Sequence, residues 1–120
     1  MSFRDHLQGV CTGVEGAVAC SLMGVDGIEV ETHLSGAAEE IDLKSLLIEY
    51  SSVFRNVRDA ADLHQAGDIA ELSINTDKLV TVARLVSPDY FMVVALKPEG
   101  NYGKARYLLR VAAPKVRSEL

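Results

Sequence analysis

Three segments of the chain are almost entirely apolar and lack the alternation of a half-exposed strand. They are Ala17–Met23, Leu79–Val86 and Phe91–Leu96. Strands with apolar side chains on both faces occur where helices cover both faces of a sheet. Two further segments, Ile28–Leu34 and Ile69–Ile74, alternate apolar with polar residues and fit the sheet edges. The pattern therefore predicts a five-stranded sheet between two helical layers.

Turn residues indicate how these strands are connected. Asp26-Gly27 predicts a tight hairpin turn between the first two strands. Asn75-Thr76-Asp77 and Ser87-Pro88-Asp89 separate the last three strands, the final one expected over Tyr90–Leu96. The sheet is therefore expected to be mostly antiparallel, with an N-terminal hairpin and a later meander of three strands.

Three segments have helical spacing. The first carries an apolar stripe over Phe3, Leu7, Val10 and Val14, with Ser2 as a candidate N-cap. The second runs from about Glu39 to His64 and is expected to turn one stripe to the core: Leu43, Leu46, Leu47, Tyr50, Phe54, Val57 and Ala61. The last runs from Tyr102 towards Glu119, with a bend or an early end expected at Pro114. The predicted fold is an α/β (α+β) three-layer arrangement of helix, hairpin, long helix, three-strand meander and helix.

Composition narrows the class of protein. The 120 residues suit one domain, expected to span 1–120, with an ordinary 48% apolar and 24% charged content. A net charge of −5 disfavours the broad basic surface of nucleic-acid-binding proteins. Two cysteines favour a reduced setting, and no segment reaches the roughly 18 apolar residues of a membrane span. We expect a cytoplasmic protein.

The charges are unevenly distributed along the chain. Residues 1–96 contain 6 basic and 15 acidic residues, whereas residues 97–120 contain 6 basic and 2 acidic ones. Three of the basic residues share one face of the last predicted helix, namely Arg106, Arg110 and Arg117. This face has two interpretations: a solvated helix surface, or a contact surface for an acidic partner or an anionic membrane.

The entry to the last helix needs to be compared with a phosphate-binding loop. A P-loop has four residues between its glycines and a Ser or Thr after its lysine. Here two residues separate Gly100 from Gly103, and Ala105 follows Lys104. We therefore interpret this segment as a loop in which Asn101 caps the helix and Gly103 permits close helix–sheet packing.

Other chemical sites are not indicated. His6, His33 and His64 lie on different predicted elements, and Cys11 and Cys20 do not form a CxxC motif. No nucleophile-elbow motif is present. The sequence predicts no catalytic residue, no metal site and no cofactor, and hence a protein that is not an enzyme.

The long helix has an unusual outer face. The face opposite the predicted core stripe carries Ile41, Ser45, Ile48, Ser52, Arg55 and Asp59. Small serines allow close approach of another backbone, while isoleucines supply apolar area and Arg55 a planar donor. Singly exposed apolar residues are also common on ordinary surfaces. We predict this face as a partner-binding surface, without dividing it between a sister subunit and another protein.

The chain resembles the Roadblock/dynein light-chain family. The resemblance is carried by Ser21–Ile28 in the first hairpin, Asp89–Leu96 in the last strand and Gly100–Arg106 entering the last helix. It extends over essentially the whole chain and is closest to bacterial MglB-type members. It implies a homodimer with a continuous intermolecular sheet, paired long helices, and binding to a small Ras-like GTPase whose nucleotide cycle it regulates.

Three functions from different classes follow as hypotheses. The favoured one is a homodimeric module that regulates or scaffolds a Ras-like GTPase, by activation or by repositioning its switch loops. The alternatives are a nucleotide-insensitive dimerisation adaptor and a small enzyme or ligand sensor. Because an exposed strand edge invites pairing with another chain, we predict a dimer edge at Ile69, Glu71, Leu72 and Ser73.

Overall fold

The computed structural model describes residues 2–35 and 41–120, and within them it contains three helices and five strands. In chain order they are α1 (Phe3–Gly13), β1 (Ala17–Gly24), β2 (Glu29–Leu34), α2 (Leu43–Leu63), β3 (Glu71–Asn75), β4 (Val80–Ser87), β5 (Tyr90–Leu96) and α3 (Tyr102–Arg117). The predicted succession of elements is confirmed. The tight turn at Asp26-Gly27 is also present, and Gly27 has the positive φ of 92° that such a turn requires.

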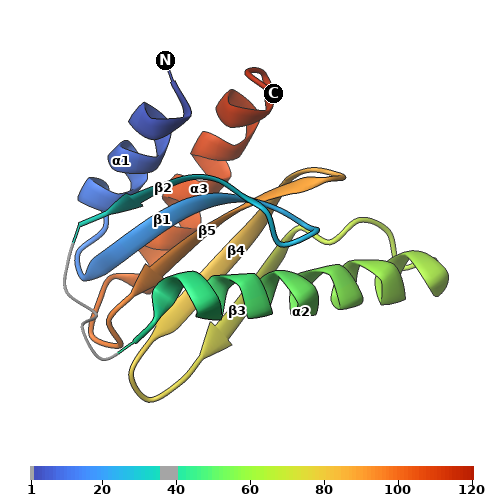
Figure 1. Cartoon of the computed structure of the whole chain (residues 1–120), viewed down its shortest axis with the longest axis horizontal. Helices are drawn as coiled ribbons and strands as arrows, with labels where there is room; N and C mark the ends of the chain where they lie inside the picture. The colour runs from blue at the N-terminus through green and yellow to red at the C-terminus, as the bar shows by residue number, and fades with distance from the viewer. Residues whose placement is uncertain (1, 36–40) are drawn as a thin grey trace.

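The five strands form one antiparallel sheet in the order β2-β1-β5-β4-β3. The two segments with alternating polarity are therefore the edge strands, as predicted. Figure 1 shows α2 across one face of the sheet and α1 with α3 against the other. The predicted α/β/α layering is confirmed, and it explains why the central strands are apolar on both faces.

Each face of the central strands contributes to a different part of the core. On β5, Met92 and Val94 pack with α1 and α3, whereas Phe91 and Val93 pack beneath α2. The same division applies to β4, where Val82 faces α1 and α3. The sheet therefore separates two apolar layers, and α2 is the sole helix on its side among the described residues.

Side-chain caps define the starts of α1 and α2. Ser2 and Asp5 form a full capping box on α1, as the sequence indicated. α2 begins at Leu43 because Asp42 accepts hydrogen bonds from the Ser45 amide, at 3.2 Å, and from the Ser45 hydroxyl, at 2.8 Å. These bonds hold the pKa of Asp42 below its usual value. The start predicted near Glu39 lies outside the described residues, and Ile41 precedes the helix.

Two local expectations are wrong. Of the bend or early end expected at Pro114, the early end is absent, because α3 continues through this exposed proline to Arg117. The close approach predicted for Gly103 belongs instead to Gly100, where an added Cβ would lie 2.7 Å from the Glu15 carbonyl oxygen. Asn101 does cap α3, accepting a hydrogen bond of 3.0 Å from the Lys104 amide.

None of the helices in the described part of the chain is long and apolar enough to span a membrane.

Candidate functional site

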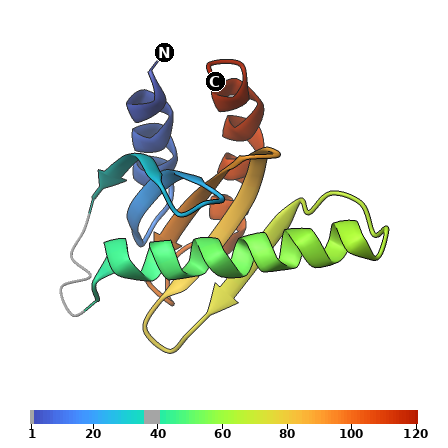
Figure 2. The ribbon, with the colours of Figure 1, turned by 45° about the vertical axis from the view of Figure 1, so that its right-hand side comes forward.

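The helix α2 is long but shallowly buried. Of its 21 residues only Leu47, Ser51 and Phe54 are buried, whereas the 16-residue α3 buries five. Figures 1 and 2 show that the C-terminal part of α2 projects beyond the strands. An amphipathic helix in a globular protein usually buries a wider stripe than this. α2 therefore leaves apolar surface available on its two flanks.

The residues facing the sheet set the rotation of α2. Phe54 stacks on Phe91 of β5. Leu47 lies two turns earlier on the same buried side of the helix. Ser51 fits between them because its hydroxyl donates to the Ile48 carbonyl of its own helix. With these three residues on the sheet, the other faces of α2 follow from the helical repeat of 3.6 residues.

One flank of α2 borders the edge strand β3. It carries Leu46, Tyr50, Val53 and Val57, and we call these four residues the β3-side stripe. Their spacing of four, three and four residues is that of a helix–helix seam. Val53 is 42% exposed and Val57 is 38% exposed. The sequence placed Val57 in the core, and this prediction is wrong. The sheet does not cover this flank of α2, so Val57 faces outward.

The strand β3 turns its two faces to different helices. Leu72 and Ile74 line an apolar pocket beneath α2 together with Tyr50 and Phe54. Glu71 and Ser73 face α3, where the Glu71 carboxylate binds Arg106. Ser73 shares a 2.7 Å hydrogen bond with the Tyr102 hydroxyl.

The outer edge of β3 adjoins the β3-side stripe. Among the described strands, β3 pairs with β4 alone, so its other edge is unpaired. Glu71, Leu72 and Ser73 lie in this strand as predicted, but Ile69 does not, because β3 begins at Glu71. Ile69 instead packs against the core cluster beneath α2.

The other flank of α2 borders the β1–β2 turn. It carries Ile48, Ser52 and Arg55, which we call the hairpin-side stripe. Ile48 is 43% exposed, and a Cβ added to Gly27 of the turn would lie 3.8 Å from its Cγ2 atom. The Arg55 Nη1 atom donates a 3.2 Å hydrogen bond to the Val25 carbonyl oxygen. The turn and the helix therefore form one continuous surface.

The structure groups only part of the predicted partner-binding face. Ile48, Ser52 and Arg55 come together beside the turn. Ile41 precedes α2 and packs against core residues, and Ser45 takes part in the helix cap. Asp59 accepts hydrogen bonds from Arg58 further along the helix.

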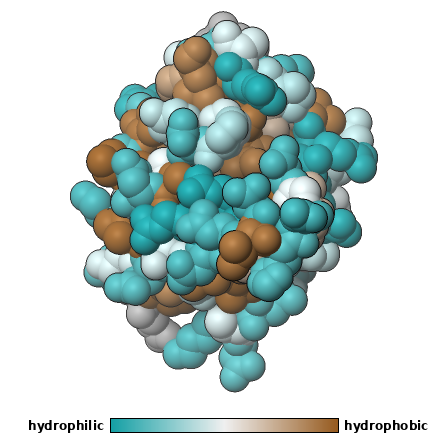
Figure 3. Space-filling view, turned by 90° about the vertical axis from the view of Figure 1, so that its right-hand side faces the viewer, coloured by the Kyte–Doolittle hydropathy of each residue, from teal (hydrophilic) through white to brown (hydrophobic). Residues whose placement is uncertain are grey.

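The exposed apolar residues that the sequence interpretation missed include Ile28 and Val53. Ile28 follows the turn and is 66% exposed, next to the hairpin-side stripe. Val53 was assigned to neither face, although its spacing from Leu46, Tyr50 and Val57 was a detectable signal. On the side of the molecule in Figure 3, apolar side chains emerge as separate patches among hydrophilic ones. On this side of the molecule the exposed apolar surface is therefore divided into small patches.

The described residues give little support for metal binding or for cysteine reactivity. They contain no group of three or more His, Cys, Asp or Glu residues that could hold a metal ion. Burial raises the pKa of the Cys20 thiol, and it also raises the pKa of the Cys11 thiol, which hydrogen-bonds Ser35. Thiols with raised pKa values are poor nucleophiles at neutral pH.

Comparison with solved structures identifies the family. MglC from Myxococcus xanthus is 52% identical to this chain, and the match covers 100% of both chains with a TM-score of 0.73. The chain belongs to the MglC family. A Roadblock/LC7 domain from Streptomyces avermitilis is 15% identical, with coverage of 99% and 98% and a TM-score of 0.82. MglB from Myxococcus xanthus is 16% identical, with coverage of 99% and 97% and a TM-score of 0.77.

These matches place the MglC family within the Roadblock fold. The predicted resemblance to Roadblock proteins of the MglB type is therefore confirmed. No protein-family model and no curated protein sequence matches the chain. A profilin from Acanthamoeba castellanii shares the fold at 13% identity and a TM-score of 0.59. The MglC-family chain thus has a profilin-like core with a Roadblock arrangement of elements.

Proposed function

We propose that this chain, acting as one unit over residues 1–120, is a non-enzymatic homodimeric module that regulates or scaffolds a small Ras-like GTPase. The observation that carries the proposal is the shallow burial of α2, which leaves two separate stripes open on its two flanks. The choice of a small Ras-like GTPase as the partner is supported by the resemblance to Roadblock proteins.

The β3-side stripe is assigned to the sister subunit. Val53, Val57 and Tyr50 would pack against the same residues of a second copy, while the unpaired edge of β3 would pair with its symmetry mate. Antiparallel pairing about a two-fold axis keeps the two α2 helices on the same face of a continuous sheet. One symmetric contact would thus bury the apolar stripe and satisfy the open strand edge.

The hairpin-side stripe is assigned to the GTPase. It lies on the opposite flank of α2, so a homodimer built on β3 would leave it accessible. Ile48 and Ile28 supply apolar contact area, and Ser52 allows close approach. Interfaces of this kind combine an apolar centre with a polar rim, which Arg55 and Asp59 would provide.

Regulation would occur by repositioning the switch loops and not by an inserted arginine. The Arg55 side chain is half-buried, and its hydrogen bond to the Val25 carbonyl holds it along the surface. The neighbouring Arg58 is also held, by a 2.8 Å bond to the Pro88 carbonyl. An arginine finger must instead reach the transferring phosphoryl group of the GTPase.

The proposal is tested by affinity capture of purified small GTPases loaded with GDP or a GTP analogue. Nucleotide-dependent capture that Ile48→Asp abolishes supports the regulator. Asn56→Asp serves as the matched variant, because it places the same charge at an exposed position of α2 outside both stripes. Capture of another protein regardless of nucleotide would support the alternative, a dimerisation adaptor without nucleotide sensitivity.

A further inference from the structure

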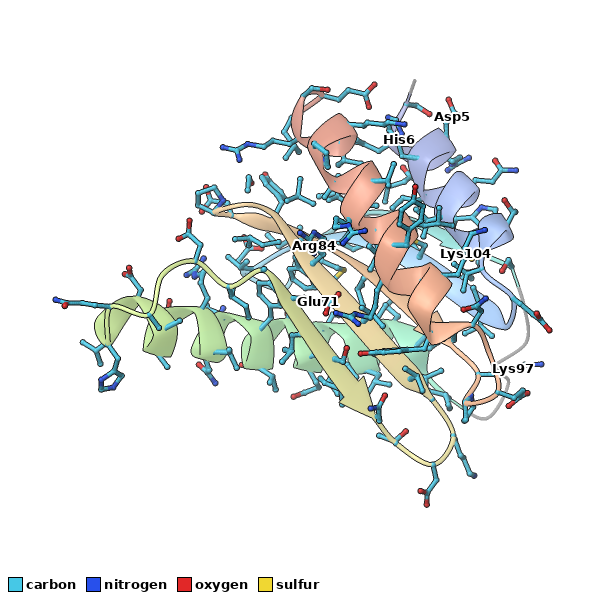
Figure 4. The ribbon with its side chains drawn as sticks, turned by 180° about the vertical axis from the view of Figure 1, so that it is seen from behind. Asp5, His6, Glu71, Arg84, Lys97 and Lys104 are labelled. Atoms are coloured by element: carbon cyan, nitrogen blue, oxygen red, sulfur yellow. The ribbon has the colours of Figure 1, made fainter. Side chains whose placement is uncertain are left out.

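The face of the sheet opposite α2 contains a groove with arginines on both walls. It lies between β3 and β4 on one side and α3 on the other, and has a volume of about 320 Å³. Its lining includes Glu71, Arg84, Gly103, Arg106, Tyr107 and Arg110. Figure 4 views the sheet from this side and shows Glu71 and Arg84 on neighbouring strands beside α3. Glu71 and Arg84 are direct cross-strand partners.

Among the described residues, one of the three guanidinium groups, that of Arg106, pairs with a carboxylate. Arg106 binds the Glu71 carboxylate through Nε, at 3.0 and 2.9 Å from its two oxygens, and through Nη2 at 2.9 Å. This contact raises the pKa of Arg106. Across the described residues, the Arg84 guanidinium has no hydrogen-bond or ion-pair partner. Arg110 lies over the Tyr107 ring, 5.6 Å from its centroid.

The groove is positively charged in a protein that is otherwise acidic. One carboxylate against three guanidinium groups leaves it with two uncompensated positive charges, while the chain as a whole carries −5. The acidic excess of the chain lies in residues 1–96, so a polyanion is attracted to the groove and the adjoining α3 and repelled elsewhere. The arrangement of the charges therefore favours a ligand small enough to enter the groove.

We propose that this groove binds an acidic segment of a partner polypeptide. Arg84 and Arg110 present planar forks of donors that match carboxylates, and Tyr107 offers a ring against which a side chain can pack. A membrane is less suited, because the groove is concave and Glu71 lies within it. The groove is on the opposite face of the sheet from α2 and the hairpin-side stripe, so the inference does not depend on the proposed GTPase contact.

The test measures binding of a fluorescently labelled oligo-glutamate peptide by anisotropy at physiological salt. The wild-type chain is compared with Arg84→Gln/Arg110→Gln. The matched control is Lys104→Gln/Lys115→Gln, which removes the same charge from the other side of α3. We expect about a fivefold loss of affinity for each arginine removed, as for a partly exposed ionic contact, and little change in the control.

A third variant separates groove binding from any effect on folding. Glu71→Gln removes the carboxylate that occupies Arg106, so it should tighten peptide binding by about fivefold. Circular dichroism checks that each variant is folded. The proposal is overturned if the arginine and lysine variants lose affinity equally, if Glu71→Gln weakens binding, or if no peptide binds. It is also overturned if the chain co-sediments with phosphatidylserine vesicles but does not bind the peptide.

Discussion

Phe54 of α2 lies flat against Phe91 of β5, with ring centroids 4.6 Å apart and ring planes 10° from parallel. Both rings are almost fully buried. Because few other side chains of α2 reach the sheet, this stack fixes the rotation of the helix about its axis. It thereby determines which residues of α2 face β3 and which face the β1–β2 turn.

Replacing Phe54 should therefore destabilise the fold strongly. Phe54→Ala would leave a cavity beneath α2, and we expect the free energy of unfolding to fall by about 3–5 kcal/mol. Urea denaturation followed by circular dichroism measures the change. Val57→Ala on the same helix is the control, since Val57 is partly exposed and should cost less. Equal effects of the two substitutions would contradict the role of the stack.

Val53→Arg should shift the protein from dimer to monomer. It places a charge in the centre of the β3-side stripe, where a symmetric contact would bring two copies of it together. Light scattering at micromolar concentration gives the mass. Asn56→Arg is the control, because Asn56 faces solvent on the same helix. A wild-type chain that is already monomeric at this concentration would show that the proposed homodimer is wrong.

Arg55→Ala should weaken binding of the GTPase without changing its turnover at saturation. The substitution removes a contact of the hairpin-side stripe and the bond to Val25, which both affect affinity. GTP hydrolysis is measured over a titration with each form of the chain. An arginine finger would contribute about 10³–10⁵ to the turnover rate. If affinity is intact but stimulated hydrolysis is lost, Arg55 acts as a finger and repositioning is the wrong mechanism.

Thr81→Val should stabilise the protein. Thr81 lies on β4 beneath α2, and its buried hydroxyl oxygen has no hydrogen-bond partner within the described residues. A buried polar group without a partner costs about 1–3 kcal/mol, and valine has nearly the same shape. The thermal midpoint should rise, as measured by circular dichroism. A Thr81→Ser variant keeps the hydroxyl and should show no such gain.

The cap of α2 should make stability depend on acidic pH. Its hydrogen bonds with Ser45 lower the pKa of Asp42 from the usual 3.8 in the folded state. As the pH falls, the Asp42 carboxylate is therefore protonated in the unfolded chain before it is protonated in the folded one. The stability that the cap contributes is complete above pH 3.8 and is lost as the pH falls through the lower pKa of the folded state.

The comparison variant for this effect is Asp42→Asn, which keeps a capping side chain that does not titrate. Urea unfolding at several pH values from about 5 to about 3 gives the free energy of both proteins. The wild type should lose stability relative to the variant as the pH falls. Parallel curves for the two proteins would show that the cap carries no pH dependence.

The sequence by itself determined the elements and which strands lie at the centre and at the edges of the sheet. The unbroken apolar runs of β1, β4 and β5 are a local property of each strand, and burial on both faces follows from it directly. The same applies to the Ser2 cap, the turn at Gly27 and the edge positions of β2 and β3. Such features depend on residues a few positions apart, so periodicity reveals them.

Only the tertiary structure decided the rotation of α2. The helical pattern placed Phe54 and Val57 together on one core stripe and left Ser51 off it, whereas the structure buries Phe54 and Ser51 and exposes Val57. Contact with Phe91, far along the chain, places Phe54 inward and leaves Val57 outward. A long-range contact of this kind overrides the preference that the helical pattern alone would indicate.

The arginine groove is likewise a product of the fold. The sequence revealed the basic face of α3 but not Arg84, which comes from β4 and lies beside α3 because that helix covers one face of the sheet. Glu71 joins it through cross-strand pairing. Charges from separate elements meet only when sheet register and helix position are set together, which no single segment of sequence specifies.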